Sequence, residues 1–270
     1  MCYYSPDGFP ISLSSHVSRR KRGEEYQGVL AATRVTGAST ERMEVRRATL
    51  DTCAEATGIV MVIDVLRAFT TAAFAFDAGA EAITLVGEVA EAFALRDEHP
   101  DWLIMGEEGG LPVKGFDFGN SPAAFLDQDL TGRRLIQRTS SGTQGVVRTR
   151  RADRVLASSL CCARATAEYV GRFGLERVTA VITGSHPGGL GDEDQACADY
   201  LEALMGGARV DRETVIERVR ASRAGQKLQD PEHPQFSPLD VDCAVDIDRF
   251  PRAMVVQDED DHRVLRQDFV

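Results

Sequence analysis

Short apolar runs alternate with amphipathic stretches along residues 58 to 205, and this alternation limits the folds open to the chain. Six runs have the length of buried strands: 58–64, 82–86, 102–105, 134–137, 154–157 and 178–183. Strands that are apolar throughout and separated by helices are typical of parallel sheets, because helices cover both faces of such a sheet. We therefore predict a three-layer α/β fold, with a mostly parallel or mixed sheet and helices on both faces.

Helices are expected between and after these runs. The first follows residue 64 and runs through Ala78, where Gly79 closes it, since glycine readily adopts the backbone conformation that ends a helix. The others are expected at 88–98, 142–150, 160–170, 192–205 and 212–223. A last apolar run, at 253–256, is expected to form a strand. The Pro-containing segment 229–238 is long enough to form a lid or an edge loop.

The N-terminal segment differs in composition from the rest of the chain. Residues 1–28 are Ser-rich and basic and have no hydrophobic periodicity, so we predict a poorly ordered extension. Residues 29–270 are expected to form a single α/β domain. If that domain has two subdomains, the break is expected near residues 172–190.

Charge and composition exclude several classes of protein. Asp and Glu number 42 against 31 Lys and Arg, a formal charge of −11, which argues against nucleic acid as a partner. No apolar stretch approaches the ~18 residues that span a membrane, and no secretory signal is recognisable. The six Cys form neither a C-x-x-C pair nor a zinc-binding spacing. We therefore expect a cytoplasmic protein with reduced thiols.

Asp64 stands at the end of the first predicted strand, where a helix begins. Ligands bind beyond the carboxyl ends of strands in such sheets, so Asp64 is a candidate metal ligand or catalytic carboxylate. The alternative is a helix N-cap, a position that aspartate favours. Arg67 follows within one helical turn, and its planar guanidinium suits phosphate or sulfonate oxygens. Thr70 and Thr71 add hydroxyls, although helical threonines often bond to their own backbone.

The segment Gly115 to Pro122 is the most specific local signature. Its Gly and Pro are explained by a turn, in which Pro restricts the residue before it and can begin a helix. The turn does not by itself explain Asn120 and Ser121 side by side. We interpret these two as groups that bind a ligand or orient a water molecule.

A hydroxyl-rich loop follows the strand predicted at 134–137. It contains Thr139, Ser140, Ser141, Gly142 and Thr143 and opens the next predicted helix. Backbone N–H groups and hydroxyls at that position would form a cradle for an anion. The loop lacks the Lys and the spacing of a nucleotide P-loop, so ATP or GTP is not implied.

Acidic residues follow two further predicted strands. Glu107 and Glu108 end a strand beside glycines, and Glu193 and Asp194 begin the helix at 192–205. Carboxylates are the ligands that Mg²⁺ prefers, so these groups are compatible with a divalent cation. Surface exposure in the first case and the helix dipole in the second are the alternative explanations.

Taken together, these motifs resemble the 2-phosphosulfolactate phosphatase family, whose members make sulfolactate on the route to coenzyme M. The resemblance covers roughly residues 59 to 256. It rests on the motifs at 64–71, 106–107, 115–122 and 140–143, together with 159–160 and 193–194. It implies a Mg²⁺-dependent phosphoric monoester hydrolase that releases phosphate from a small phosphorylated or sulfonated acid.

The resemblance also implies roles for particular residues. Asp64, Arg67 and Glu107 are the expected catalytic residues, with Arg67 as the clamp for an anion. Asp64, Glu193 and Asp194 are the expected Mg²⁺ ligands. Substrate contacts are expected from Thr70, Thr71, Asn120, Ser121, Thr139, Ser140, Ser141, Gly142 and Thr143.

Three positions depart from the family pattern. Glu108 replaces an Arg, Ser141 replaces an Asn, and Phe69 stands where a smaller residue is usual. A carboxylate in place of a cation should weaken the binding of a doubly anionic substrate, unless a metal ion compensates for the added negative charge. The departures at Glu108 and Ser141 favour the alternative of a non-catalytic anion-binding protein on the same scaffold. Retention of Asp64, Arg67 and the pair at 120–121 favours the enzyme.

Asp64 has two possible roles in phosphate hydrolysis. It could attack phosphorus directly or bind the metal, and we favour the metal ligand.

A regulator that uses the thiols of Cys161 and Cys162 is a further hypothesis for the chain. The expected partners are a small acid substrate and further copies of the chain in a homo-oligomer.

Overall fold

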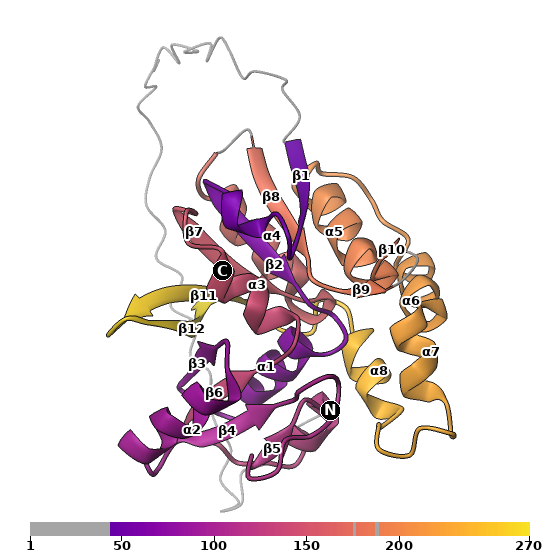
Figure 1. The fold of residues 1–270 in the computed structure, drawn as a ribbon. Helices are drawn as coiled ribbons and strands as arrows, with labels where there is room; N and C mark the ends of the chain where they lie inside the picture. Colours follow the sequence, from indigo (N-terminus) through magenta and orange to yellow (C-terminus); the bar gives the residue numbers. More distant parts are fainter. Residues whose placement is uncertain (1–43, 175–176, 187–188) are drawn as a thin grey trace, which may run out of the picture. The chain divides into compact units, whose positions relative to one another are not determined.

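The computed structural model describes residues 44–174, 177–186 and 189–270, which form one mixed ten-stranded sheet with helices on both faces (Figure 1). The extension predicted for residues 1–28 lies outside the described residues. Six of the nine neighbouring strand pairs are parallel and three are antiparallel. The predicted α/β class with a mostly parallel, mixed sheet is therefore confirmed.

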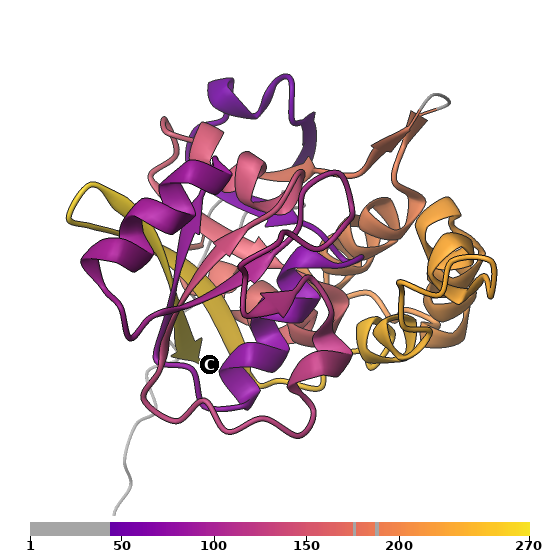
Figure 2. The same cartoon turned by 60° about the horizontal axis from the view of Figure 1, so that its bottom comes forward.

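The sheet consists of two parallel groups joined by an antiparallel hairpin (Figures 1 and 2). The first group contains, in spatial order, β1 (Glu44–Thr49), β8 (Arg177–Ile182), β2 (Ile59–Ile63) and β7 (Arg154–Ser158). The second contains β3 (Ala82–Val86), β6 (Arg134–Arg138), β4 (Leu103–Gly106) and β5 (Phe118–Gly119). The hairpin of β11 (Arg252–Glu259) and β12 (His262–Phe269) lies between them. β9 (Ser185–His186) and β10 (Gly189–Leu190) form a separate small sheet.

The helices are shorter than predicted in places. They are α1 (Ala68–Asp77), α2 (Val89–Glu98), α3 (Gly142–Arg148), α4 (Ala163–Gly171), α5 (Asp192–Met205), α6 (Arg212–Ala221), α7 (Arg223–Gln229) and α8 (Leu239–Ala244). Short 3-10 turns occur at η1 (Cys53–Glu55), η2 (Pro122–Phe125) and η3 (Leu160–Cys162). None of the described helices is long and apolar enough to cross a bilayer.

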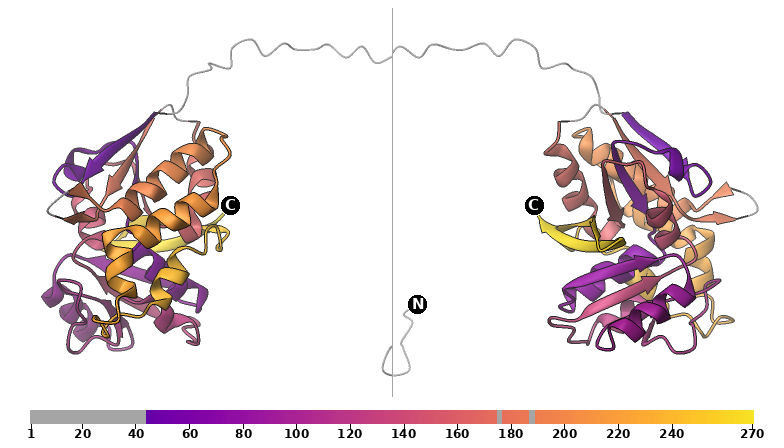
Figure 3. Two further views of the ribbon diagram at one scale, coloured as in Figure 1. Left: turned by 90° about the vertical axis from the view of Figure 1, so that its right-hand side faces the viewer. Right: turned by 60° about the vertical axis from the view of Figure 1, so that its left-hand side comes forward.

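The helix predicted at 212–223 is wrong in its C-terminal part. The chain breaks at Ser222, whose side chain accepts a hydrogen bond from the Gly225 N–H (3.0 Å) and so begins α7 as a separate helix. The loop predicted at 229–238 is confirmed between α7 and α8 except for its first residue, because Gln229 ends α7. Helix α7 lies together with α5 and α6, all drawn in orange, on one side of the strands (Figure 3).

Strand β2 shows why both faces of the sheet are covered. All five of its residues are buried. Val60 and Val62 pack in one core with the aromatic residues of α1, whereas Ile59, Met61 and Ile63 pack in a second core with α4 and α5. Alternate side chains of a strand point to opposite faces, so a continuous apolar run requires helices on each.

Within the ten-stranded sheet, three strands were not predicted because their composition is polar or their length is short, and the two-residue strands β9 and β10 of the small sheet were not predicted either. β1 and β12 carry Arg, Asp and Glu side chains along much of their length. β1 is an edge strand, where charged side chains stay in water. β12 places Arg266 against Glu259 of β11 (2.6 Å), so its charges are paired across the hairpin. The short β5 completes the opposite edge.

Candidate active site

Asp64 lies where the ends of several elements meet. It follows β2, and only 6% of its surface is exposed. Its Oδ1 accepts the N–H of Ala68 at the start of α1 (2.9 Å). A Cβ on Gly142, at the start of α3, would lie 2.8 Å from the Asp64 Oδ2 and 2.6 Å from the Ala68 Cβ. Only glycine at 142 allows the two helices to approach the carboxylate so closely.

The environment of Asp64 disfavours its charged form. Burial raises the pKa of Asp64 to about 6, and the neighbouring carboxylates of Glu107 and Glu193 add to this rise. Hydrogen bonds from the backbone of residues 68 and 142 oppose it. Burial likewise raises the pKa of Asp194 well above its usual range, with further contributions from Asp64 and Glu193. Glu107, Glu193 and Asp194 therefore each interact electrostatically with Asp64, and these four buried acids come from three separate parts of the sequence.

Asp194, in the first turn of α5, connects that helix to the ends of strands β2 and β8. Its Oδ1 accepts the Val65 N–H (2.8 Å), and its Oδ2 accepts the Gly184 N–H (2.8 Å). The first residues of α5 are thereby held against the ends of β2 and β8. The neighbouring Glu193 is buried, and a Cβ on Gly191 would lie 2.8 Å from its Oε1. Glycine at 191 is thus needed for the close approach of the Glu193 carboxylate.

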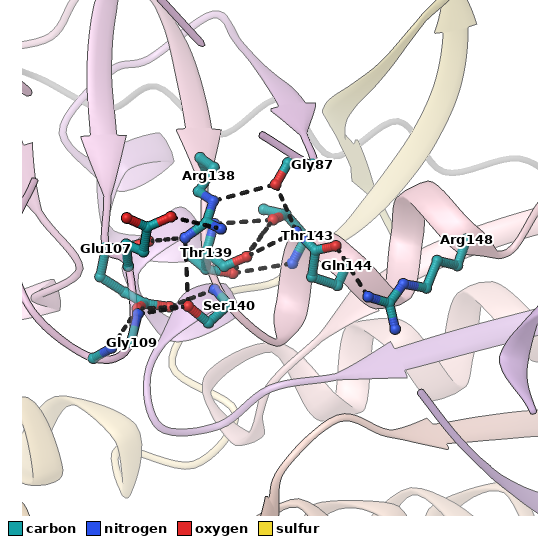
Figure 4. Close-up of polar contacts among 11 residues, drawn as sticks. Gly87, Glu107, Gly109, Arg138, Thr139, Ser140, Thr143, Gln144 and Arg148 are labelled. Atoms are coloured by element: carbon teal, nitrogen blue, oxygen red, sulfur yellow. Dashed lines mark hydrogen bonds and ion pairs between the residues drawn. The ribbon is translucent and has the colours of Figure 1, made fainter. Parts of the chain in front are cut away.

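Glu107 is held between two loops (Figure 4). Its Oε1 accepts the Ser140 N–H (2.5 Å), and its Oε2 accepts the Ser140 hydroxyl (3.0 Å) and the Gly110 N–H (2.6 Å). Gly106 precedes it with a φ of 136°, and a Cβ there would lie 1.8 Å from the Arg138 carbonyl oxygen. The Glu107 and Ser140 motifs, which are separate in the sequence, are therefore brought together.

The hydroxyl-rich loop bonds largely to itself. The Thr139 hydroxyl accepts the Thr143 N–H (3.0 Å), and the Thr143 hydroxyl accepts the Thr139 N–H (2.9 Å). Both threonines are buried. The Ser141 hydroxyl, by contrast, has no hydrogen bond to any residue that the structure describes. Thr139 and Thr143 thus shape the loop, and Ser141 is its available hydroxyl.

Arg67 belongs to a buried ion pair that sequence analysis missed. Its Nη1 lies 2.9 Å from the Asp240 Oδ2, and the two side chains are 10% and 0% exposed. The Ser121 hydroxyl donates to the other oxygen of Asp240 (2.5 Å). Asp240 on α8 therefore brings the predicted residues Arg67 and Ser121 together. The acidic start of α8 gives no sequence signal for this role, because surface helices commonly begin with acids.

The remaining predicted side chains differ in their surroundings. The Thr70 hydroxyl donates to the Val65 carbonyl (2.7 Å), and the Thr71 hydroxyl donates to the Arg67 carbonyl (2.9 Å). Both are fully buried, as in the alternative of backbone-bonded threonines, so a substrate contact stays a prediction for them. Asn120 is 7% exposed, and its Oδ1 has no hydrogen-bond partner among the described residues.

Glu108 does not add an unpaired charge to the acidic cluster. Its side chain is 64% exposed and lies 3.3 Å from the Arg138 Nη2. Arg138 is buried on β6 and also donates to the carbonyl oxygens of Gly87 (3.2 Å) and Glu107 (2.8 Å). The departure at Glu108 is therefore compensated by a cation that sequence analysis missed. Phe69 is fully buried in the core with other α1 side chains.

The described carboxylates are not arranged as a ready metal site: no three His, Cys, Asp or Glu among residues 44–174, 177–186 and 189–270 converge closely enough to hold an ion. Their chemistry nevertheless suits a hard divalent cation. Mutual repulsion and burial both disfavour ionised carboxylates, and a cation between them would relieve that cost.

Comparisons with known proteins find similar chains that share one description. A family model described as 2-phosphosulpholactate phosphatase matches residues 46–257. A protein of Bacillus subtilis (strain 168) named probable 2-phosphosulfolactate phosphatase is 38% identical over 184 residues, 68% of this chain and 80% of that relative. Proteins of the same name from Carboxydothermus hydrogenoformans and Thermus thermophilus are 38% and 37% identical over 54% and 55% of this chain. The matches span 60% and 62% of those two relatives.

Proposed function

Because the chain belongs to the 2-phosphosulpholactate phosphatase family, we propose that it hydrolyses 2-phosphosulfolactate to sulfolactate and phosphate. The family is one of phosphoric monoester hydrolases. One observation carries the proposal for this chain: Asp64 is buried where β2, α1 and α3 meet, within the electrostatic reach of Glu107 and Glu193. Buried acids with raised pKa values are more common at functional sites than elsewhere.

The proposed cofactor is Mg²⁺, with Asp64, Glu193 and Asp194 as its ligands. The oxygen chemistry of these side chains and their mutual repulsion support this assignment. No three of the described carboxylates converge closely enough to hold an ion, so binding requires that they move together. When bound, Mg²⁺ would neutralise phosphate charge and lower the pKa of a water molecule.

The chain's own groups would position the substrate. Arg67 has five N–H donors, and its ion pair with Asp240 fixes the guanidinium while leaving donors for phosphate oxygens. The Ser141 hydroxyl and the Asn120 NH₂ group, which donate to no other described residue, are the neutral donors proposed for the same anion. Glu107 orders the loop that contains Ser140 and Ser141, and its negative charge adds to the attraction for a cation. In phosphate transfer such positioning and charge neutralisation supply most of the catalysis.

Phosphate release from 2-phosphosulfolactate and from 4-nitrophenyl phosphate tests this proposal. The wild type and Asp64→Asn would be assayed with Mg²⁺ and with EDTA. We expect metal-dependent turnover that falls by at least about a hundredfold in Asp64→Asn, since a group at the reacting centre is removed. Asp153→Asn, at an exposed aspartate outside the site, is the matched control and should retain the wild-type rate.

The alternative functions give different results in the same assay. A folded wild type that binds phosphate but releases none from either substrate would support the non-catalytic anion-binding protein. The thiol hypothesis places chemistry at Cys161 and Cys162, which are fully buried. Unchanged turnover after both are replaced by serine would exclude it. A cytoplasmic location, a homo-oligomeric state and the absence of a nucleic-acid partner stay predictions.

A further inference from the structure

Two cations from distant parts of the sequence lie against one aromatic ring. The Arg67 Cζ is 5.0 Å from the centre of the Phe236 ring, and the Lys227 Nζ is also 5.0 Å from it. Phe236 lies in the loop between α7 and α8, and Lys227 lies on α7. Phe236, in the loop expected to act as a lid or an edge, therefore contacts both the predicted anion clamp and a second cation.

The two cations differ in how their charge is compensated. Arg67 is in a buried ion pair with Asp240. Lys227 is exposed and has no ion-pair partner among the residues that the structure describes. Arg138, at the end of β6 beside the Glu107 carbonyl, is paired with Glu108. Lys227 is thus a cation beside the site whose charge is left for a ligand.

Lys227 also lies next to the loop that holds Glu107. Its Nζ is 4.0 Å from the position that a Cβ on Gly110 would take. The N–H of Gly110 in turn donates to the Glu107 Oε2 (2.6 Å). The ammonium group therefore borders the Glu107 loop on one side and the Phe236 ring, shared with Arg67, on the other.

We propose that Lys227 determines specificity by binding one of the two acidic groups that the substrate has besides its phosphate, the sulfonate or the carboxylate. This inference rests on the proposed function, in which Arg67 binds the phosphate. A flexible ammonium suits such a role, because it acts as a point charge and adapts to an anion of either geometry. In a chain with a formal charge of −11, an uncompensated cation at this edge also favours the approach of a polyanion.

Substrate selectivity in Lys227→Met tests the inference. The measured quantity is the ratio of kcat/KM for 2-phosphosulfolactate to kcat/KM for 4-nitrophenyl phosphate, which has no acidic group besides its phosphate. We expect the ratio to fall about tenfold or more, as is typical when a charged hydrogen-bond partner is lost, and Lys227→Arg to restore much of it. Including 2-phospholactate shows whether the carboxylate alone accounts for the effect. Lys114→Met, at the other lysine of the described chain, is the matched control and should keep the wild-type ratio.

A second measurement does not depend on turnover. Trace acetylation with acetic anhydride, followed by peptide mass spectrometry, compares Lys227 with Lys114. Sulfolactate, which has both acidic groups but no phosphate, should slow acetylation of Lys227 and leave Lys114 unaffected. An unchanged ratio in Lys227→Met with equal acetylation in the presence of sulfolactate would overturn the inference while leaving the phosphatase intact. A wild type that hydrolyses neither ester would instead contradict the proposed function, and protection of Lys227 would still report its binding of the acid.

Discussion

Replacing Asp64 by asparagine should remove a pH-dependent cost to stability in the metal-free protein. Burial and the neighbouring carboxylates raise the pKa of Asp64 from its ordinary value of 3.8 to about 6. Above both values the folded protein must therefore hold an ionised carboxylate in surroundings that disfavour it. Asparagine has a similar shape, carries no charge, and can still accept the Ala68 N–H through its oxygen.

The sign and size follow from proton linkage. Between pH 3.8 and about pH 6 the folded state retains a proton that the unfolded state has lost, so the stability of the wild type falls as the pH rises through this range. The complete loss is about 3 kcal/mol, because each pKa unit corresponds to ~1.36 kcal/mol. Asparagine lacks this loss. It instead has a roughly constant cost of about 1–2 kcal/mol, since its NH₂ group replaces the Asp64 oxygen that faces the Gly142 N–H.

The assay is urea unfolding in EDTA at pH 5 and pH 8. The unfolding free energy of Asp64→Asn relative to wild type should rise by roughly 1.5 kcal/mol between these two values. Asp153→Asn, the exposed control, should show a much smaller change. Addition of Mg²⁺ at pH 8 should raise the Tm of the wild type more than that of Asp64→Asn. A constant offset between Asp64→Asn and wild type at both pH values would refute the electrostatic argument.

Three further substitutions test the packing and charge of the site. Gly142→Ala should cost about 1–3 kcal/mol in urea unfolding, because its Cβ would overlap the carboxylate after β2 and the first residue of α1; a neutral result would mean that the two helix ends are loosely packed. Asp240→Ala should lower the unfolding free energy by about 3–5 kcal/mol and raise KM for phosphate esters, since it leaves Arg67 as an uncompensated buried charge. Unaltered stability and KM would contradict the importance of the ion pair. Glu108→Ala should change the unfolding free energy by less than about 1 kcal/mol, because Glu108 pairs with Arg138 through a side chain that is mostly exposed. A large loss of kcat/KM would show that Glu108 has a direct role in catalysis.

The local signals in the sequence were sufficient for the main strands and for the loops at their ends. The apolar run of β2 was recognised because every residue in it is buried, and Asp64 was placed correctly at its end. Gly106 and Gly142 also carry local information, since their close contacts exclude a side chain. The polar strands β1 and β12 give no such signal, because their stability comes from pairing with neighbouring strands and from ion pairs across them.

The partners of the predicted site residues could not be found in the same way. Asp240 is 173 residues from Arg67 in sequence, and Asp194 is 129 residues from the Val65 N–H that it accepts. Lys227 meets the Gly110 loop only because α7 packs beside it. Nothing in the composition of either segment indicates which distant group it will contact.

The sequence by itself therefore determined the α/β class, the places where strands end, and the chemical types that gather there, because hydrophobic periodicity and glycine requirements are local properties. Only the tertiary structure decided which hydroxyls are consumed by the backbone, which charges are compensated, and which cation remains available. Hydrogen bonds and ion pairs depend on distance in space, and burial decides how much each charge costs. The same residue types would have a different chemistry in another arrangement.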